Sequence, residues 1–149
     1  MVISNFISIS ICEICNDSII RKKGGMVMNL TREETVREHR KMWNWIADQF
    51  EKGRETEAYY LKIEYVVMLE KDEEEILHNC FLCQYDCQEN KGFCKSCPLD
   101  WGDSCSFACE LGSSPLWRKC QYASEDGDYA VAAKIARQIA NLPERERKL

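Results

Sequence analysis

Four cysteines in the middle of this sequence are spaced as two Cys-x-x-Cys pairs, Cys80 with Cys83 and Cys94 with Cys97. Each pair can present two thiolates to one tetrahedral ion, and the loop of ten residues between the pairs is long enough to fold back. Dense cysteine in a chain without a secretion signal is typical of metal binding rather than of disulfides. The spacing therefore predicts one structural zinc ion bound by these four residues.

Four further cysteines, Cys87, Cys105, Cys109 and Cys120, lie in the same part of the chain. Because Cys105 and Cys109 are spaced as another pair, this set either forms a second or alternative metal site or consists of small buried residues and thiols. An iron–sulfur cluster is the weaker alternative to zinc, since it also uses four thiolates. Colour distinguishes the two, because iron–sulfur proteins are brown and zinc proteins are colourless.

Catalytic chemistry is not predicted. The sequence has only two histidines, His39 and His78, whereas a catalytic zinc site keeps an open position and usually has His or carboxylate ligands. The pair Cys80 and Cys83 lacks the βαβ context of a redox motif. We therefore expect no enzyme. His39 is expected to be a partly buried, hydrogen-bonded residue, and His78 an exposed loop residue or a substitute ligand.

The charge balance bears on the class of partner. The 149 residues include 25 acidic and 20 basic side chains, for a net charge of -5. An acidic chain gains little from neutralising phosphates, so non-specific DNA binding is disfavoured and docking on a basic protein surface is favoured. No apolar run is long enough for a transmembrane helix. These features predict a cytoplasmic protein with a protein partner, no membrane association and nucleic acid as the alternative ligand.

Residues 1–27 are predicted to be a non-native or disordered extension. Their apolar run lacks the preceding positive charge of a signal peptide. Lys23-Gly24-Gly25 can be encoded by a purine-rich stretch resembling a bacterial ribosome-binding site, so we expect Met28 to be the natural start. In that case Cys12 and Cys15 are incidental, and otherwise they are a further half-site.

The element that precedes the cysteines is predicted to be a helix over Arg32–Lys52. Thr31 and Glu34 form a capping box at its start, and Gly53 supplies a left-handed cap after its end. Its apolar residues recur at helical spacing: Val36, Met42, Trp43, Trp45, Ile46 and Phe50. A second helix is predicted over Thr56–Glu70, although its aromatic and β-branched residues would also suit a strand.

The remainder is predicted to be irregular up to a last helix. Glycines and prolines break any long element in residues 77–122: Gly92, Pro98, Gly102, Gly112 and Pro115. Residues 71–75 continue the second helix or form a charged loop. Asp126 or Asp128 is expected to cap the last helix, which ends near Pro143 and is followed by a frayed charged tail from Glu144. Its apolar stripe is Tyr129, Ala132, Ile135, Ala136 and Ile139.

These elements predict a mainly α fold, in which a helical pair and a C-terminal helix surround an irregular, metal-stapled, cysteine-rich loop. A single domain is expected over 28–149, with helices in 28–76, the zinc-binding loop region in 77–122 and the last helix and tail in 123–149. The middle region is too poor in apolar residues to fold alone, so the metal would organise it. The four tryptophans are expected to pack in the core rather than to stack on bases: Trp43, Trp45, Trp101 and Trp117.

Four stretches carry a resemblance to a known group: His39-Arg-Lys-Met-Trp-Asn-Trp-Ile-Ala47, Cys80-Phe-Leu-Cys83, Cys94-Lys-Ser-Cys-Pro-Leu-Asp-Trp101 and Ala136-Arg-Gln-Ile-Ala-Asn-Leu-Pro-Glu-Arg145. Over most of Met28–Arg147 the chain resembles small, zinc-binding-like, cysteine-rich proteins of phages and prophages of Gram-positive bacteria. The resemblance implies the four predicted ligands, with Cys109 as a further candidate, and no catalytic residue. Cys87 and Cys105 are particular to this chain.

The resemblance, small size and acidic charge lead to one functional hypothesis. We expect a non-enzymatic binding protein made during phage infection that acts on a host or phage protein, for example by inhibiting a host defence or a nucleic-acid enzyme. The alternative is a zinc-knuckle regulator that binds nucleic acid, since Phe81, Phe93 and Trp101 lie near the cysteine pairs. A metal-dependent enzyme is the weakest hypothesis.

Overall fold

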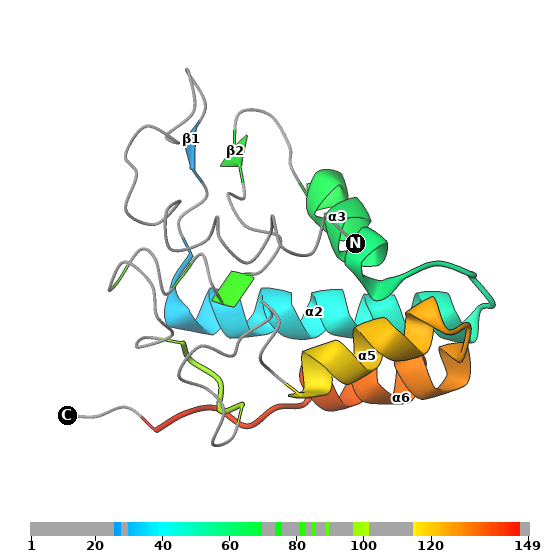
Figure 1. Ribbon diagram of the computed structural model, residues 1–149. Coiled ribbons are helices and arrows are strands. Elements are labelled where there is room, and N and C mark those ends of the chain that lie inside the picture. Colours follow the sequence, from blue (N-terminus) through cyan, green and yellow to red (C-terminus); the bar gives the residue numbers. More distant parts are fainter. Residues whose placement is uncertain are drawn as a thin grey trace.

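A computed structural model describes residues 26–27, 30–69, 74–75, 81–82, 85, 89, 97–101 and 115–146, with the backbone alone at 26–27, 74–75 and 115. Helices dominate this part of the chain (Figure 1): α2 (Arg32–Glu51), α3 (Ala58–Leu69), α5 (Pro115–Glu125) and α6 (Tyr129–Ala140). The prediction of a mainly helical protein is confirmed. Within the described ranges, no helix is long and apolar enough to cross a membrane.

The first helix, α2, begins at the predicted capping box. The Thr31 hydroxyl accepts a hydrogen bond from the Glu34 N–H at 3.1 Å, and the Glu34 carboxylate accepts one from the Thr31 N–H at 2.8 Å. Hydrogen bonds from the backbone N–H and from the side chain of Thr31 lower the pKa of the Glu34 carboxyl group, because they favour its charged form. At the other end, Gly53 has a φ of 89°, a value that glycine adopts without steric cost. Both ends of the predicted helix are therefore confirmed.

The second helix, α3, is stabilised at its start by side chains of α5. The Ala58 N–H donates to Ser124 Oγ at 3.0 Å, and the Tyr59 N–H donates to Gln121 Oε1 at 2.9 Å. The first N–H groups of a helix have no partner within it, so they need such acceptors when they are buried. Capping by α5 fixes where α3 starts. The prediction of a helix rather than a strand in this segment is confirmed.

The third helix, α5, corrects the prediction that residues 77–122 are irregular. It begins at Pro115, although a proline at this position was expected to break a helix. Proline is in fact favoured at the first helical position, because its φ is already helical and its missing N–H is not needed there. Strong helix formers follow it, including Leu116, Lys119 and Gln121.

The last helix, α6, has the predicted cap and end. Asp128 accepts a hydrogen bond from the Val131 N–H at 3.4 Å, and Asn141 follows the final turn. A tight turn at Gly127, which has a φ of 80°, separates α6 from α5. The two helices therefore form an antiparallel hairpin that lies against one side of α2 (Figure 1).

The core lies between α2 and this hairpin. The face that α6 buries consists mostly of small residues: Ala132, Ala133, Ala136, Ile139 and Ala140. Small residues let the two backbones approach closely, and α2 supplies the large side chains of Met42, Trp43 and Ile46, which are all fully buried. The Trp43 ring meets Trp117 of α5 edge-on, with 5.6 Å between the ring centroids. Core packing is thus confirmed for Trp43, Trp117 and the buried Trp101, whereas Trp45 is only half-buried.

The segment after α6 is held in place. Leu99 and Glu144 form an antiparallel bridge, which is flanked by a hydrogen bond of 2.9 Å from the Asp100 N–H to Pro143 O and one of 2.8 Å from the Arg145 N–H to Pro98 O. The prediction of a tail that frays from Glu144 is therefore wrong for residues 144–146. The charge of the tail did not reveal that it pairs with a segment more than forty residues earlier.

Two very short strands lie at the other side of the fold. β1 (Met26–Val27) pairs in parallel with β2 (Glu74–Glu75), with Met26 opposite Glu74. A helix or a charged loop was expected at 71–75, so the strand at 74–75 differs from both expected structures. The prediction that residues 1–27 are an extension stays a prediction, as does the division of 28–149 into three parts.

Candidate metal centre

Most of the predicted ligands lie outside the described residues. Of the four zinc ligands, Cys97 is described, whereas Cys80, Cys83 and Cys94 are not. The same holds for five further candidates: Cys12, Cys15, Cys87, Cys105 and Cys109, and also for His78. In the part of the chain that the structure describes, no three His, Cys, Asp or Glu side chains are grouped to hold a metal. The zinc site stays a prediction, although the structure describes Cys97 and the two residues between Cys80 and Cys83.

The two residues between Cys80 and Cys83 lie in the hydrophobic core. Phe81 and Leu82 are both fully buried. The Phe81 ring meets Tyr65 of α3 edge-on, with 6.4 Å between the ring centroids. Burying side chains of this size stabilises a fold by about 1.5–3 kcal/mol each. The backbone between the two predicted ligands is thus anchored in the core.

Two arginines bind the backbone at the fourth predicted ligand. Cys97 is 1% exposed, and its carbonyl oxygen accepts a hydrogen bond from Arg145 Nη1 at 3.3 Å. The next carbonyl oxygen, that of Pro98, accepts one from Arg32 Nη2 at 3.2 Å. These contacts fix the backbone at Cys97, and the charge of Arg32 is balanced by its ion pair with Glu144. The role of Cys97 as a zinc ligand stays a prediction.

Arg32 also connects three segments of the chain. Besides the Pro98 contact, its Nη1 pairs with Glu144 Oε1 at 2.7 Å and its Nη2 donates to Arg145 O at 2.6 Å. The first residue of α2 therefore binds both the segment that contains Cys97 and the segment that follows α6. We call these contacts the Arg32 junction.

Cys120, named above as an alternative ligand, lies between α5 and α6. Its side chain is fully buried, and its Sγ donates to Ala132 O at 3.5 Å. Burial raises the pKa of this thiol to about 12, although the charge of Lys62 lowers it in part. A thiol in such surroundings stays protonated and unreactive. The geometry supports the reading of Cys120 as a small buried residue.

Lys62 places a positive charge in the core, and this buried charge was not predicted from the sequence. The residue is 3% exposed, and its Nζ lies 4.5 Å from the centroid of the Trp117 ring and 6.0 Å from that of Trp43. Attraction between a cation and aromatic faces offsets part of the cost of removing the ammonium group from water. The sequence indicates this buried charge only by a lysine that lies among the apolar positions of the predicted helix 56–70.

His39 is a buried, hydrogen-bonded residue of the core. It is fully buried, and its Nε2 lies 3.0 Å from the carbonyl oxygen of Ile139. The ring meets Trp101 nearly at a right angle, with 6.1 Å between centroids. The expected hydrogen bond is confirmed, and the burial is greater than expected. His39 links α2 to the last turn of α6 and to the segment that contains Cys97.

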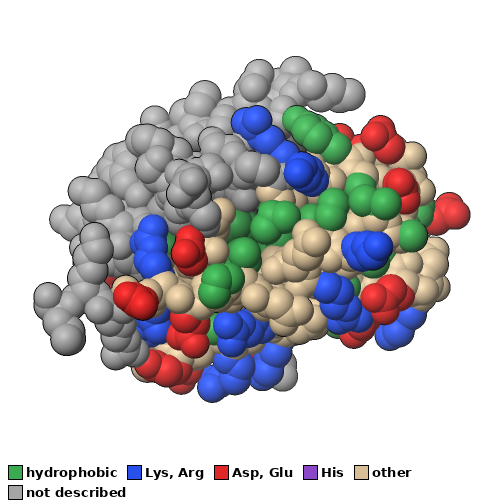
Figure 2. Space-filling view, turned by 90° about the horizontal axis from the view of Figure 1, so that it is seen from below, with side chains coloured by type: hydrophobic (Ala, Val, Ile, Leu, Met, Phe, Trp, Pro, Cys, Tyr) green, Lys and Arg blue, Asp and Glu red, His purple; other side chains and the backbone are tan. Residues whose placement is uncertain are grey.

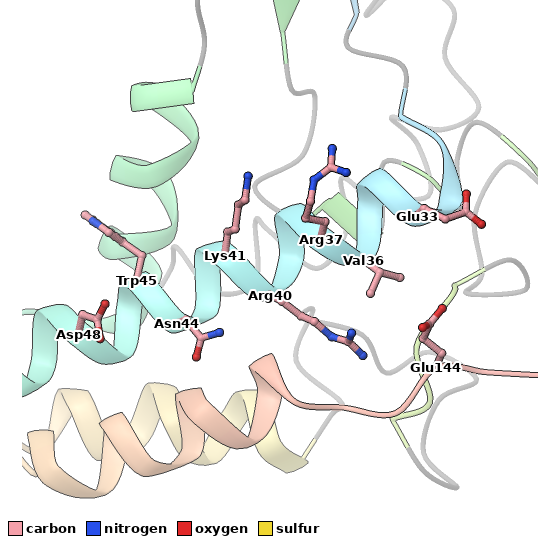
Figure 3. A pocket seen from close by; sticks show the side chains of 9 residues that line it. All are labelled: Glu33, Val36, Arg37, Arg40, Lys41, Asn44, Trp45, Asp48 and Glu144. Atoms are coloured by element: carbon pink, nitrogen blue, oxygen red, sulfur yellow. The ribbon is translucent and has the colours of Figure 1, made fainter.

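A groove that sequence reasoning missed runs along the outer face of α2 (Figure 3). We call it the α2 groove, and its volume is about 610 Å³. Its lining residues come from α2 and from the segment after α6: Glu33, Val36, Arg37, Arg40, Lys41, Asn44, Trp45, Asp48 and Glu144. The signal was present in the sequence, since cations and a tryptophan recur there at helical spacing. The groove offers a half-buried indole beside exposed cations.

No family model, no curated protein and no solved structure matches this chain.

Proposed function

We propose that this protein is a non-enzymatic, zinc-stapled binding protein made during phage infection. In this proposal Cys80, Cys83, Cys94 and Cys97 hold one zinc ion, which organises the middle of the chain. The helices carry the surface that binds a host or phage protein. Inhibition of a host defence or of a nucleic-acid enzyme is the version that the resemblance to phage proteins favours.

The observation that carries this proposal is the outer face of α3. Tyr60, Val67 and Met68 are 51%, 61% and 47% exposed, although the opposite face of the same helix is packed in the core. A helix that is apolar on all sides is normally buried on all sides. Tyrosine and methionine are also enriched in protein interfaces. The outer face of α3 is therefore the surface on which we expect a protein partner.

A second apolar surface allows a controlled comparison. Figure 2 shows the molecule from below, where apolar side chains form a narrow stripe flanked by Lys and Arg side chains. The helices α5 and α6 lie on this side in Figure 1, and they expose Tyr122 and Val131 at 57% and 41%. Charged substitutions on the two surfaces can thus be compared without touching the core.

The test is affinity capture from host cells, with and without phage infection, using the full chain. We expect one specific partner with the wild-type protein, loss of that partner with Val67→Asp plus Met68→Asp, and retention with Val131→Asp. Recovery of no specific partner would count against a binding function. If Val131→Asp alone abolishes binding of the partner, the interface lies on α6 instead of α3.

The metal part of the proposal has its own test. Elemental analysis of freshly purified, reduced protein should find about one zinc per chain, and the protein should be colourless. A brown sample that contains iron and sulfide would instead support an iron–sulfur cluster. A metal-free sample with a sharp cooperative melting transition would contradict the zinc site.

The alternative function is nucleic-acid binding, and it is supported by other residues than the aromatic side chains near the cysteine pairs. Phe81 and Trp101 are buried, so they are not available to stack on bases in this structure. The α2 groove instead has Trp45 beside the exposed cations Arg37 and Lys41. A salt titration with labelled single- and double-stranded oligonucleotides tests this alternative, which requires binding that weakens as salt rises.

A further inference from the structure

The outer face of α5 carries charges of opposite sign on the two sides of an exposed tyrosine. Tyr122 is 57% exposed. Arg118 and Lys119 lie four and three residues before it, and Glu125 and Asp126 lie three and four residues after it. All four charged residues are exposed, and Asp126 keeps its place at the end of the helix because its N–H donates to Tyr122 O at 2.9 Å. We call these five residues the α5 face, which is basic before Tyr122 and acidic after it.

The charges of the α5 face are not balanced within the described part of the molecule. The ion pairs found there involve other cations, and none of them includes a residue of this face. Glu125 accepts a hydrogen bond from the neutral amide of Gln121 at 3.1 Å, which leaves its charge in place. Along α5 the cations are six to eight residues from the acids, whereas side chains that pair within a helix are three or four residues apart. These charges are therefore available to a ligand.

The order of charges on the α5 face also opposes the dipole of α5 itself. A helix is stabilised by acidic side chains near its start and by basic side chains near its end. In α5 the first turn has no acidic residue and the last turn has no basic residue, and Glu125 is the final residue of the helix. The helix alone therefore gives no reason for this order. A contact with opposite charges outside the molecule would offset the unfavourable interaction.

We infer that the α5 face binds the same face of a second copy of this chain, with the two α5 helices antiparallel and a two-fold axis at Tyr122. Residues three and four positions from Tyr122 lie about 4.5 and 6 Å along the helix from it. At about 100° per residue, Arg118 and Glu125 lie to one side of Tyr122, and Lys119 and Asp126 to the other. The two-fold axis therefore places Arg118 opposite Glu125 of the partner subunit, and Lys119 opposite Asp126 of the partner subunit. The two Tyr122 rings meet at the axis and form an apolar centre.

The charge order favours a second copy over other ligands. A nucleic acid or an anionic membrane is negative along its whole length, so Glu125 and Asp126 would repel it. A second copy presents the required order of charges by symmetry, because a two-fold interface uses the same surface on both subunits. The contact is independent of the partner surface on α3. Since α5 has 11 residues, the interface is small, and we expect a weak dimer with a Kd of about 10–100 µM.

The first experiment is sedimentation velocity of the reduced, full-length protein at concentrations of about 1–300 µM, which bracket this Kd. We expect the mass to rise with concentration from that of one chain, 17.4 kDa, toward that of two. The association should weaken as salt rises, because the ion pairs are at the surface. A wild-type protein that stays monomeric over the whole range would overturn the inference.

Charge reversal tests the antiparallel order. Arg118→Glu plus Lys119→Glu makes the α5 face acidic throughout, and Glu125→Lys plus Asp126→Lys makes it basic throughout. Each double variant should self-associate more than about tenfold more weakly than the wild type, whereas a mixture of the two should form a mixed dimer. The chain with all four changes has the reversed order, so it should self-associate again. Self-association of both double variants at the wild-type level, or none by the chain with four changes, would overturn the inference.

Two controls accompany these variants. Arg37→Glu plus Lys41→Glu reverses two exposed cations of α2 and changes the net charge by the same amount as the acidic double variant, and its Kd should stay within about twofold of the wild type. An equal loss in this control would show an effect of net charge alone and overturn the inference. Val67→Asp plus Met68→Asp on α3 should self-associate like the wild type, which separates this contact from the proposed binding function. Circular dichroism spectra and melting curves confirm that each variant is folded.

Discussion

Cys120 is a thiol that the fold keeps in its protonated form. Burial between α5 and α6 raises its pKa to about 12, so at about pH 8 only about one molecule in ten thousand carries the reactive thiolate. We expect iodoacetamide to leave Cys120 unmodified in the native protein and to label it after unfolding. Mass spectrometry of the peptide that contains Cys120 measures both states. Rapid labelling of the native protein would contradict the buried position.

Glu57 makes the stability of the protein depend on pH. Burial raises the pKa of its carboxyl group, and the neighbouring charge of Glu125 raises it further. The folded state then binds a proton more readily than the unfolded state, so this group adds stability as the pH falls through its folded pKa. We expect Glu57→Gln to melt at a higher temperature than the wild type at about pH 7 and at the same temperature at about pH 3.

The matched control for Glu57 is Glu55→Gln, which changes an exposed side chain in the same loop. Its melting temperature should stay near that of the wild type at both pH values. A difference between Glu57→Gln and the wild type that persists at low pH would show that the effect is not one of ionisation.

Single residues differ in how much of their role the sequence reveals. Thr31, Glu34 and Gly53 act within four residues of their own position, and local rules predicted them correctly. Lys62 and Cys120 have roles that depend on which other helices cover them. A lysine near two tryptophans and a thiol between two helices are arrangements of the tertiary fold, so spacing along the chain could not predict them.

At the scale of elements, the start of α3 depends on α5. Ser124 is buried, and its Oγ accepts the hydrogen bond of the Ala58 N–H. Ser124→Ala leaves that buried N–H without its acceptor, so we expect the free energy of unfolding to fall by about 1–2 kcal/mol. Denaturation in urea measures this loss. Asp126→Ala, an exposed change in the turn after α5, is the control and should cost less than about 0.5 kcal/mol.

The helices also show where the spacing of apolar residues predicts the structure correctly. α2 and α6 have apolar residues at helical spacing and clear caps, and both were predicted with nearly correct bounds. α5 was missed because Pro115 was interpreted as a residue that breaks a helix rather than as the first residue of one. The α2 groove was not predicted either, although Arg37, Arg40, Lys41 and Trp45 recur at helical spacing along its outer face.

At the scale of the whole molecule, the Arg32 junction joins the start of α2, the Cys97 segment and the segment after α6. We expect Arg32→Ala to lower the free energy of unfolding by about 1–3 kcal/mol, because three hydrogen bonds are lost and the Arg32 side chain is only 16% exposed. Arg37→Ala is the matched control, since among the described residues this more exposed arginine of the same helix has a single ion pair, at 3.8 Å, and the change should cost less than about 0.5 kcal/mol.

The predicted zinc ion should matter to the stability of the whole domain. Because Phe81, Leu82 and Cys97 belong to one core with α2 and α3, removal of zinc by a strong chelator is expected to lower the melting temperature and broaden the transition. Differential scanning calorimetry before and after chelation measures this change, and added zinc should restore the original curve. An unchanged melting curve after complete removal of zinc would mean that the metal does not organise the core.

The pairing of segments 97–101 and 142–146 lies beyond what sequence reasoning could predict at this scale. Neither segment has strand periodicity, and each is short and irregular by composition. The contacts that join them involve a bridge between Leu99 and Glu144 and the side chain of Arg32. Such contacts become visible only when three distant parts of the chain are placed together.

The distance in sequence between Arg32 and Glu144 has a consequence during synthesis. The two residues are 112 positions apart, and α6, which covers Met42, Trp43 and Ile46, is translated late. A nascent chain must therefore emerge from the ribosome through residue 140 before α6 can cover the apolar face of α2, and through residue 145 before the Arg32 junction can form. Polypeptides that terminate prematurely, before α6, would expose that face to proteases and chaperones, so we expect such fragments to be cleared from the cell while the full-length product persists.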